Sequence, residues 1–489
     1  MRYVAGVERT QAVLFPQSLE EYISEENPVR FIDAYVAGLD LVGLGFTHAR
    51  PSERGRPAYD PGDLLRLYIY GYLNRVRSSR RLEKEAQRNV EVMWLMRKLR
   101  PDFKTIADFR VDNRTALTAV FKQFVCFCRD LEMFGGELVA IDGSKFRASN
   151  SRQRLFTPGK LADRLRRIEQ QIHAYLAELD DNDQEPEPSE AEQSALSAQQ
   201  LQARIAQLRE RHRKYRDLQQ EMAARGLKQI ALTDADARLM PQSFSQGGGT
   251  VVAYNVQIAV DAKYKLIAAY EVTNDTNDLR QLTHMATQAK QALQVEELEV
   301  VADAGYYDGD EVAACQAQGI EVYVPKPTNS SKSLSQGLFS KQDFVYDAAL
   351  DAYRCPAGQL LTYRFTATQQ QGRALKHYYT SIPACANCAL RAKCTTRTDD
   401  GPRQVTRLVN EGALERMAQR MAAQPHKFSL RKQLAEHPFG TLKRAWNSDH
   451  LLLRGLSKVN AEGALKMLAY NLRRAISVLG VPALMASLA

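Results

Sequence analysis

Apolar residues recur at helical spacing through the first part of the chain, where prolines separate the segments. The run from Asp60 to Leu73 begins with an acidic capping residue and a proline in the first turn, which is typical of a helix N-terminus. We expect further helices from about Leu82 to Leu99 and from Thr105 towards Asp130. The pattern predicts a helical N-terminal domain over residues 1–132, a candidate for DNA binding.

Strands and helices alternate over residues 133–325. A short apolar run from Leu138 stops at Asp142, and residues 247–261 alternate with a period of two before a partner strand over 266–272. A helix from about Asp278 to Leu293 leads to a strand over 298–302, and another helix leads to a strand over 321–325. This order predicts a mixed α/β sheet. We expect its first strand to lie beside its fourth and to run parallel to it.

Two insertions interrupt the sheet domain. Residues 155–228 carry two amphipathic stripes on either side of an acidic, proline-containing loop over 180–188, which predicts a helical hairpin. Residues 326–404 are polar and hold four cysteines. The last segment is helical again, at about 408–423, 429–446 and 460–479. The catalytic core should therefore combine residues 133–325 with residues 405–489.

Composition adds few constraints. With 489 residues the chain exceeds what one hydrophobic core usually supports, so several domains are expected. The formal net charge is +9, and residues 50–129 hold 18 Lys and Arg against 9 Asp and Glu. Such a basic surface can contact DNA phosphates or simply face solvent, and both interpretations stay open.

Targeting signals are not evident. No apolar run approaches the ~20 residues of a membrane span, and the N-terminal residues lack the apolar core of a signal peptide. Seven cysteines fit a reducing compartment. We therefore expect a cytoplasmic protein without membrane contact.

Three acidic residues are the candidate chemistry. Asp142 and Asp303 each follow a short apolar strand, and Glu436 lies on a basic helix near the end of the chain. One aspartate before a glycine more often caps a turn, but the repetition of the arrangement favours a shared site. Three carboxylates suit Mg2+, which prefers oxygen ligands. Two such ions about 3.5–4 Å apart can activate a nucleophile and stabilise the leaving oxygen of a phosphodiester.

Residues around these carboxylates have simpler predicted roles. Asp308 and Asp310 sit where a helix cap is wanted, and Tyr306 is expected to pack beneath the site. Pro438 follows Glu436 closely, so the helix should bend or restart there. Basic residues within two helical turns of Glu436 are expected to pair with DNA phosphates: Arg431, Lys432, Lys443 and Arg444.

The four clustered cysteines suggest a second kind of site. Cys355 lies in a Cys-Pro-x-Gly turn, and Cys385, Cys388 and Cys394 form a C-x2-C-x5-C cluster. Four thiols at this spacing suit structural zinc in a small loop module that could not otherwise fold. The alternative is a set of reduced cysteines without metal. Catalytic thiols are not favoured, because no base lies nearby in the sequence.

Together these motifs resemble a known family. Ala-Ile-Asp-Gly-Ser around Asp142, Ala-Asp-Ala-Gly-Tyr around Asp303 and Glu-His-Pro-Phe-Gly-Thr-Leu-Lys-Arg from Glu436 resemble the DDE triad of bacterial insertion-sequence transposases. Within the insertion sequence 4 and 5 assemblage, the chain is most similar to the insertion sequence 1182 group. The likeness spans nearly the whole chain and includes the cysteine cluster.

The resemblance implies more than the residues do. It implies a ribonuclease H-like core and a two-metal reaction with Mg2+, for which Mn2+ can substitute. The substrate would be double-stranded DNA, with cleavage at terminal inverted repeats and strand transfer into target DNA. A homodimer or larger assembly is expected, because two transposon ends must be joined.

The chain departs from the related families at one place. Lys443 keeps its expected spacing from Glu436, but Lys432 occupies the usual arginine position and Ser429 the usual tyrosine position. Three alternatives therefore stay open: a nuclease without strand transfer, an inactive or domesticated DNA-binding protein, and a zinc-dependent hydrolase that uses the cysteines.

Overall fold

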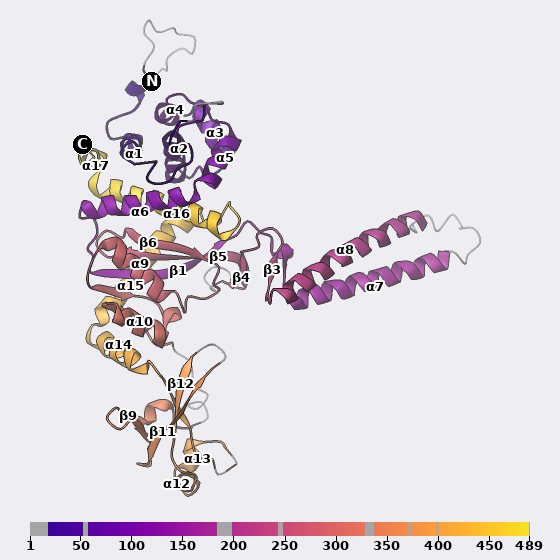
Figure 1. Cartoon of the computed structure of the whole chain (residues 1–489), viewed down its shortest axis with the longest axis vertical. Coiled ribbons are helices and arrows are strands. Elements are labelled where there is room, and N and C mark those ends of the chain that lie inside the picture. Colours follow the sequence, from indigo (N-terminus) through magenta and orange to yellow (C-terminus); the bar gives the residue numbers. More distant parts are fainter. Residues whose placement is uncertain are drawn as a thin grey trace, which may run out of the picture.

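The computed structural model describes residues 18–51, 57–182, 198–242, 248–327, 337–369, 373–397, 399 and 401–488. Its parts follow one another along the long axis (Figure 1). Helices from the N-terminal region lie at one end, a mixed sheet lies in the middle, and a smaller sheet lies at the other end. A pair of long helices projects sideways from the middle.

The N-terminal region is helical, as predicted. Asp60 caps the second helix by accepting a hydrogen bond from the Gly62 amide at 2.6 Å, which confirms the predicted helix start. The helix expected over 82–99 is wrong as a single element, because extended Asn89 ends one helix and caps the next. The helices are α1 (Pro28–Ala37), α2 (Pro61–Leu73), α3 (Ser79–Arg88), α4 (Val90–Leu95), α5 (Phe103–Asp112) and α6 (Arg114–Asp130).

The central sheet has six strands. They are β1 (Leu138–Arg147), β4 (Arg238–Pro241), β5 (Thr250–Asp261), β6 (Ile267–Thr273), β7 (Leu298–Val301) and β8 (Ile320–Tyr323). The order is β4-β5-β1-β7-β8, and β6 also pairs with β5. β5 is antiparallel to β1, whereas β7 is parallel to both β1 and β8. The prediction that the first strand lies beside the fourth and parallel to it is confirmed.

Helices cover both faces of this sheet. Leu138 and Ala140 of β1 pack with Leu434 and Ala435 of α15, whereas Val139, on the opposite face, belongs to the main core. The main core also contains residues of α6, α9 and α16, and the N-terminal helices rest on it. The arrangement is mixed α/β and compatible with a ribonuclease H-like core. The helices after β6 are α9 (Leu282–Leu293), α10 (Gly309–Ala317), α14 (Glu411–Ala423), α15 (Pro425–Gly440), α16 (Leu456–Leu479) and α17 (Val481–Ala486).

Helix α15 does not restart at its proline. Pro438 lies inside the continuous helix, so the expectation of a restart there is wrong. The disturbance comes one turn later, as a π-helical turn over Thr441–Ala445, where the Trp446 amide bonds to the Thr441 carbonyl at 2.9 Å. A proline inside a helix removes one i→i−4 backbone hydrogen bond, so α15 lacks the bond that residue 438 would donate to Leu434.

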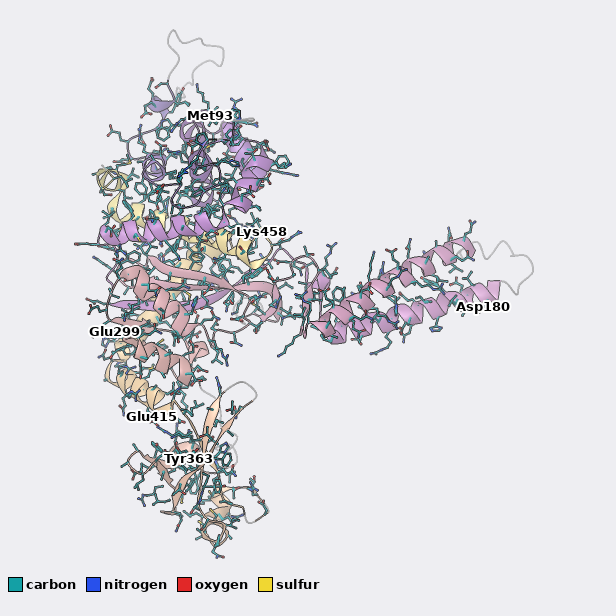
Figure 2. The ribbon with its side chains drawn as sticks, in the orientation of Figure 1. Met93, Asp180, Glu299, Tyr363, Glu415 and Lys458 are labelled. Atoms are coloured by element: carbon teal, nitrogen blue, oxygen red, sulfur yellow. The ribbon has the colours of Figure 1, made fainter. Side chains whose placement is uncertain are left out.

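The side-projecting element is the expected helical hairpin. The hairpin consists of α7 (Pro158–Asn182) and α8 (Ala198–Ala224). At its base, the short strands β2 (Leu155–Phe156) and β3 (Ile230–Ala231) pair antiparallel with each other. Apolar stripe residues such as Leu161 and Leu201 are buried between the helices. Asp180 lies near the far end of α7 (Figure 2). Residues 180–182 of the predicted acidic loop belong to α7, and the rest of that loop lies outside the described residues.

The cysteine-rich segment is a sheet, so the expectation of a loop module is wrong. Its five strands run antiparallel in the order β13-β12-β11-β10-β9. They enclose a small core of Phe344, Tyr353, Leu361, Tyr378 and Val405, which explains how the module folds. The elements are β9 (Val345–Asp347), β10 (Ala352–Arg354), β11 (Leu360–Thr368), β12 (Ala374–Tyr379), α12 (Ile382–Ala386), α13 (Arg391–Cys394) and β13 (Val405–Leu408).

Within the described ranges, every helix is too short or too polar to cross a lipid bilayer.

Candidate active site

Asp142 lies within β1, and Asp303 lies just beyond the end of the neighbouring strand β7. β1 pairs with β7 up to the position where Ala140 faces Val301, and each aspartate lies two residues further on. Because side chains alternate along a strand, Asp142 shares the face of Ala140, which is the face covered by α15. The prediction that the strands leading to these two aspartates are adjacent and parallel is therefore confirmed.

One detail of that prediction is wrong, because Asp142 does not end its strand. β1 continues to Arg147, and it stays paired with β5 over its full length beyond Asp142. Only the pairing with β7 stops at Ala140. The short β7 thus opens one edge of β1 while the long β5 satisfies the other edge, and the carboxylate emerges at this opening.

Each of the two carboxylates accepts a hydrogen bond from a nearby backbone amide. Oδ1 of Asp142 accepts a hydrogen bond from the Gly143 amide at 3.0 Å, and Oδ1 of Asp303 accepts one from the Gly305 amide at 2.8 Å. Burial raises the pKa of the Asp142 carboxyl to about 7; nearby Arg431 opposes the shift, and the charge of Asp303 adds to it. The site therefore disfavours negative charge on Asp142 unless a cation compensates it.

Helix α15 brings Glu436 to the same side of the sheet. Its neighbour Ala435 packs against the β1–β7 face, and Phe439, one turn later, lies with its ring centroid 6.1 Å from that of Phe146 on β1. Glu436 itself is exposed, and its carboxylate has no hydrogen-bond or ion-pair partner in the part of the chain that the structure describes. Within those residues, no three His, Cys, Asp or Glu side chains are arranged to hold a metal ion.

The predicted phosphate-binding residues have different surroundings. Nη1 of Arg431 lies 3.7 Å from Oδ1 of Asp142. The Lys443 ammonium donates to Oγ of Ser144 at 2.5 Å and to the Lys145 carbonyl at 2.7 Å, and burial lowers its pKa to about 8. Lys432 and Arg444 are exposed. Lys443 thus ties the π-helical turn to β1, while the exposed pair is free to meet a ligand.

Sequence reasoning missed a third aspartate beside the strand pair. Oδ1 of Asp278, in the loop before α9, accepts hydrogen bonds from Asn255 and Gln257 on β5. Tyr306 is buried beneath the site, as predicted, and its hydroxyl bonds to Gln257. The available signal was the polar alternation of Asn255 and Gln257 within a buried strand. Asp278 itself looks like an ordinary turn residue, as does Asp308, which does cap α10 as predicted.

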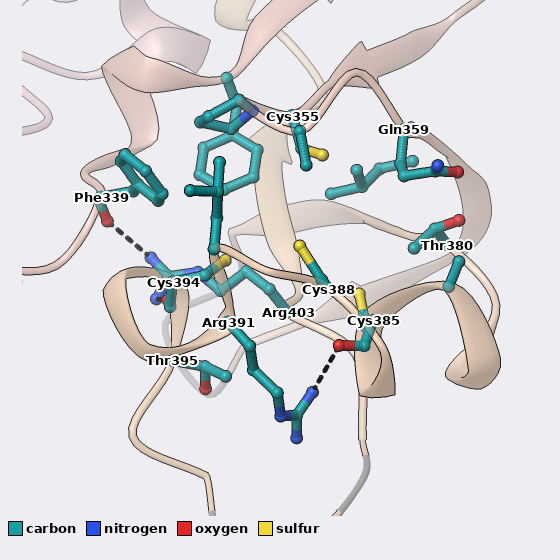
Figure 3. Close-up of a pocket in the computed structure, with 16 residues that line it drawn as sticks. Phe339, Cys355, Gln359, Thr380, Cys385, Cys388, Arg391, Cys394, Thr395 and Arg403 are labelled. Atoms are coloured by element: carbon teal, nitrogen blue, oxygen red, sulfur yellow. Dashed lines mark hydrogen bonds between the residues drawn. The ribbon is translucent and has the colours of Figure 1, made fainter.

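The four predicted zinc ligands line one pocket of the smaller sheet (Figure 3). Cys355 comes from the turn after β10, and the other three come from α12, α13 and the segment between them. Burial raises the pKa of the Cys394 thiol, and the charges of the other three cysteines add to the shift, while Arg403 opposes it. The thiols are close enough to influence one another, but their arrangement is not that of a formed metal site.

Two family models match the chain. The model described as Transposase domain (DUF772) matches residues 17–112, which include α1 to α5. The model described as Transposase DDE domain matches residues 354–476, which include Glu436 and the cysteines but neither Asp142 nor Asp303. Together the matches indicate a transposase of the DDE type, a class that binds DNA and typically uses divalent metal ions. No curated protein and no solved structure matches the chain.

Proposed function

We propose that the protein is a DNA transposase of the insertion sequence 1182 group that cuts transposon ends and joins them to target DNA. The observation that carries this proposal is the placement of Asp142 within β1 and of Asp303 just beyond the neighbouring parallel strand β7, beneath α15. The two transposase family matches support it independently. The proposed catalytic residues are Asp142, Asp303 and Glu436.

The donor set at this opening fits Mg2+ or Mn2+. Asp142 and Asp303 offer carboxylate oxygens at one point, and burial of the Asp142 charge leaves it in need of a cation. Glu436 lies on the helix that covers this face, so its carboxylate can complete the set by a change of side-chain conformation. When bound, the ions would activate water or a 3′-hydroxyl and stabilise the leaving oxygen.

The protein side chains would orient the DNA. Lys432 and Arg444 are exposed on the segment that carries Glu436, where they can pair with phosphates. Arg431 can exchange its contact with Asp142 for a phosphate. Lys443 holds the segment against β1 and acts on DNA through that position. The N-terminal helices would hold the terminal repeats, and two copies of the chain would bring two ends together in the cytoplasm.

The cysteine pocket would hold structural zinc through Cys355, Cys385, Cys388 and Cys394. The observation that supports this is their convergence on one pocket from two separate stretches of the chain, the turn after β10 and the α12–α13 segment. Thiolate ligands are the usual donors of closed zinc sites. In that role the metal would connect the α12–α13 segment to the strands, and it would take no part in DNA cleavage.

The proposal is tested by cleavage of a duplex that carries the element's terminal inverted repeat, in Mg2+. Asp142→Asn and Asp303→Asn should each lower the cutting rate about 1000-fold or more, which corresponds to about 4 kcal/mol of lost transition-state stabilisation. Asp310→Asn, an exposed carboxylate in the first turn of α10, is the matched control and should cut like wild type.

Other outcomes assign other functions. Cutting by Asp142→Asn at the wild-type rate would falsify the DDE mechanism. Cleaved ends without joined target DNA would indicate a nuclease without strand transfer. DNA binding without any cutting by the wild-type chain, unaffected by the substitutions, would indicate an inactive DNA-binding protein.

A further inference from the structure

The helical hairpin carries its charges in two unequal halves. The contact between Nε2 of His212 and Oε1 of Glu169, at 2.9 Å, marks its middle. The half nearer the central sheet, residues 152–169 and 209–228, holds 13 Lys and Arg against 5 Asp and Glu. The outer residues, 170–182 and 198–208, hold one arginine against three acidic residues. Positive charge is therefore concentrated where the hairpin meets the body of the protein.

Most of this positive charge has no partner within the protein. Three cations pair with a carboxylate three or four positions earlier in the chain: Arg166 with Asp163, Lys214 with Glu210, and Arg225 with Glu221. Six exposed arginines of α7 and α8 make no hydrogen bond or ion pair with any described residue: Arg164, Arg167, Arg209, Arg211, Arg213 and Arg216. A surplus of exposed, unpaired guanidinium groups in one place is typical of a surface that binds a polyanion.

Three of these arginines form a row along α8. Arg209, Arg213 and Arg216 follow one another at steps of four and three residues, so they lie on one side of the helix with about 5–6 Å between neighbouring Cβ atoms. At about 1.5 Å per residue, the row is about 10 Å long. The phosphates of one strand of a DNA duplex rise about 3.4 Å each, so a row of this length faces roughly three of them. The spacing of the row therefore fits a nucleic-acid backbone.

The base of the hairpin fixes this surface relative to the central sheet. Nζ of Lys160 donates to the Leu155 carbonyl at 2.6 Å, which ties the start of α7 to β2. After β3, Oδ1 of Asp234 accepts a hydrogen bond from the hydroxyl of Tyr254 on β5 at 2.6 Å. A small core at the base packs the two helices onto the short strands: Phe156, Leu161, Met222 and Ile230. Arginines on a fixed support lose less conformational entropy on binding than arginines on a free loop.

The two helices present these arginines away from the rest of the molecule. α7 and α8 pack mainly against each other, and the hairpin projects from the side of the central sheet (Figure 1). A long ligand can therefore lie along the hairpin and still reach the body of the protein at its base.

We propose that the half of the hairpin nearer the central sheet binds the sugar-phosphate backbone of duplex DNA, with Arg209, Arg213 and Arg216 at the centre of the surface. The positive charge selects a polyanion, and duplex DNA is the polyanion on which the proposed function acts, so the inference rests on that function. Contacts with phosphates carry no sequence information. The hairpin should therefore hold the end duplex and an unrelated duplex equally well.

The test measures binding of the full chain to the end duplex and to an unrelated duplex of the same length, by fluorescence anisotropy at several salt concentrations. The variant replaces Arg209, Arg213 and Arg216 together by glutamine, which keeps helix propensity similar. At about 0.15 M salt its Kd should rise roughly 10- to 100-fold for both duplexes. The slope of log K against log salt should become less steep by about 2.7, because each phosphate contact contributes about 0.9.

A matched variant replaces the same three arginines by lysine and keeps the charge. Lysine also binds phosphate as a point charge, so this variant should bind both duplexes within about 3-fold of wild type. The melting temperatures of both variants should equal that of wild type. Should the glutamine variant fail to fold, Arg213→Gln alone replaces it, with an expected change in slope of about 0.9.

The outcomes separate this inference from the proposed function. Wild-type affinity and slope in the glutamine variant would overturn the inference, and cutting of the end duplex by that variant would leave the transposase proposal standing. Weakened binding to the end duplex alone, or an equal loss in the lysine variant, would overturn the assignment to backbone contacts. A wild-type chain that binds duplexes through these arginines but does not cut in Mg2+ would keep the surface and remove the proposed function.

Discussion

The carboxylate site and the cysteine pocket are both candidate metal centres, but different scaffolds hold them. Asp142 and Asp303 project from the central sheet, whose strands belong to the main core together with α6, α9 and α16. The cysteines lie at the end of a small sheet with a core of a few side chains. A large core can keep ligands in place without metal, whereas a small one depends on metal for stability. The comparison thus separates a proposed metal for chemistry from a proposed metal for folding.

The largest difference between the two regions is expected in their local stability after the cysteine pocket loses its ability to bind metal. Cys388→Ser is expected to destabilise the smaller sheet by several kcal/mol, about 3 or more, because zinc binding and folding are coupled there. Amide hydrogen exchange of β11 and β12, compared with β1 and β7, measures the effect region by region. The central sheet should keep its protection.

The control for that experiment is Cys126→Ser on α6, which lies outside the pocket and is partly exposed. Metal analysis of the purified chains should find zinc in this control and none in Cys388→Ser. Equal protection of β11 and β12 in both variants would show that the small sheet is stable without metal, and the contrast between the two scaffolds would disappear.

Two glycine substitutions, one in each region, are expected to cause losses of stability of intermediate size. Gly143→Ala should destabilise the central sheet by about 1–3 kcal/mol, because the methyl group meets Gln257 and Asp278. Gly358→Ala, in the turn after Cys355, meets no atom within 4 Å but must adopt a φ of +81°. Its cost should be about 1 kcal/mol.

Denaturant unfolding of both variants measures these costs, and cutting of the end duplex should fall in Gly143→Ala. The first glycine is required for space and the second for backbone conformation. Equal stability of Gly143→Ala and wild type would mean that the Asp278 loop moves freely, and the tight packing proposed for that site would be wrong.

The two regions should also differ in how their stability depends on pH. Lys466 of α16 is buried and donates to the carbonyls of Ser448 and His450, and burial lowers its pKa to about 7 although Glu462 opposes the shift. Between pH 7 and the ordinary lysine value, the unfolded chain binds a proton that the folded chain does not. Stability from this group therefore rises with pH, by at most about 1.4 kcal/mol per pH unit.

The pH dependence of stability expected from the cysteine pocket has the opposite sign. Because burial raises the pKa of Cys394, the metal-free folded chain keeps a proton that the unfolded chain loses above the ordinary thiol value. Stability from this group therefore falls as pH rises. Unfolding free energies of metal-free wild type, Lys466→Met and Cys394→Ala are to be measured from pH 7 to well above the ordinary thiol value. Lys466→Met should lack the rise in stability with pH, and Cys394→Ala should lack the decline above the ordinary thiol value. Parallel curves for all three would contradict both assignments.

Much of the fold followed from the sequence because periodicity reports burial directly. The helix starting at Asp60, the hairpin stripes and the central strands other than β4 were visible as spacing of apolar residues, whereas the short strand β4 was missed. The adjacency of Asp142 and Asp303 followed too, because a parallel first and fourth strand end at one opening. Periodicity was weak in the cysteine-rich sheet, where most of β11 is exposed, so its strands were missed.

Tertiary structure alone decided how the site is completed. β5 continues along β1 beyond the end of β7, and only this length difference places Asp142 within a strand and beside an opening. The contacts of Asp278 with Asn255, and of Arg431 with Asp142, join segments far apart in the chain. The spacing of apolar residues along the chain indicates which side chains are buried, but it does not indicate which side chains distant in the sequence come into contact. The sequence therefore determined the strands and their acidic residues, and three-dimensional packing determined the neighbours of those acids.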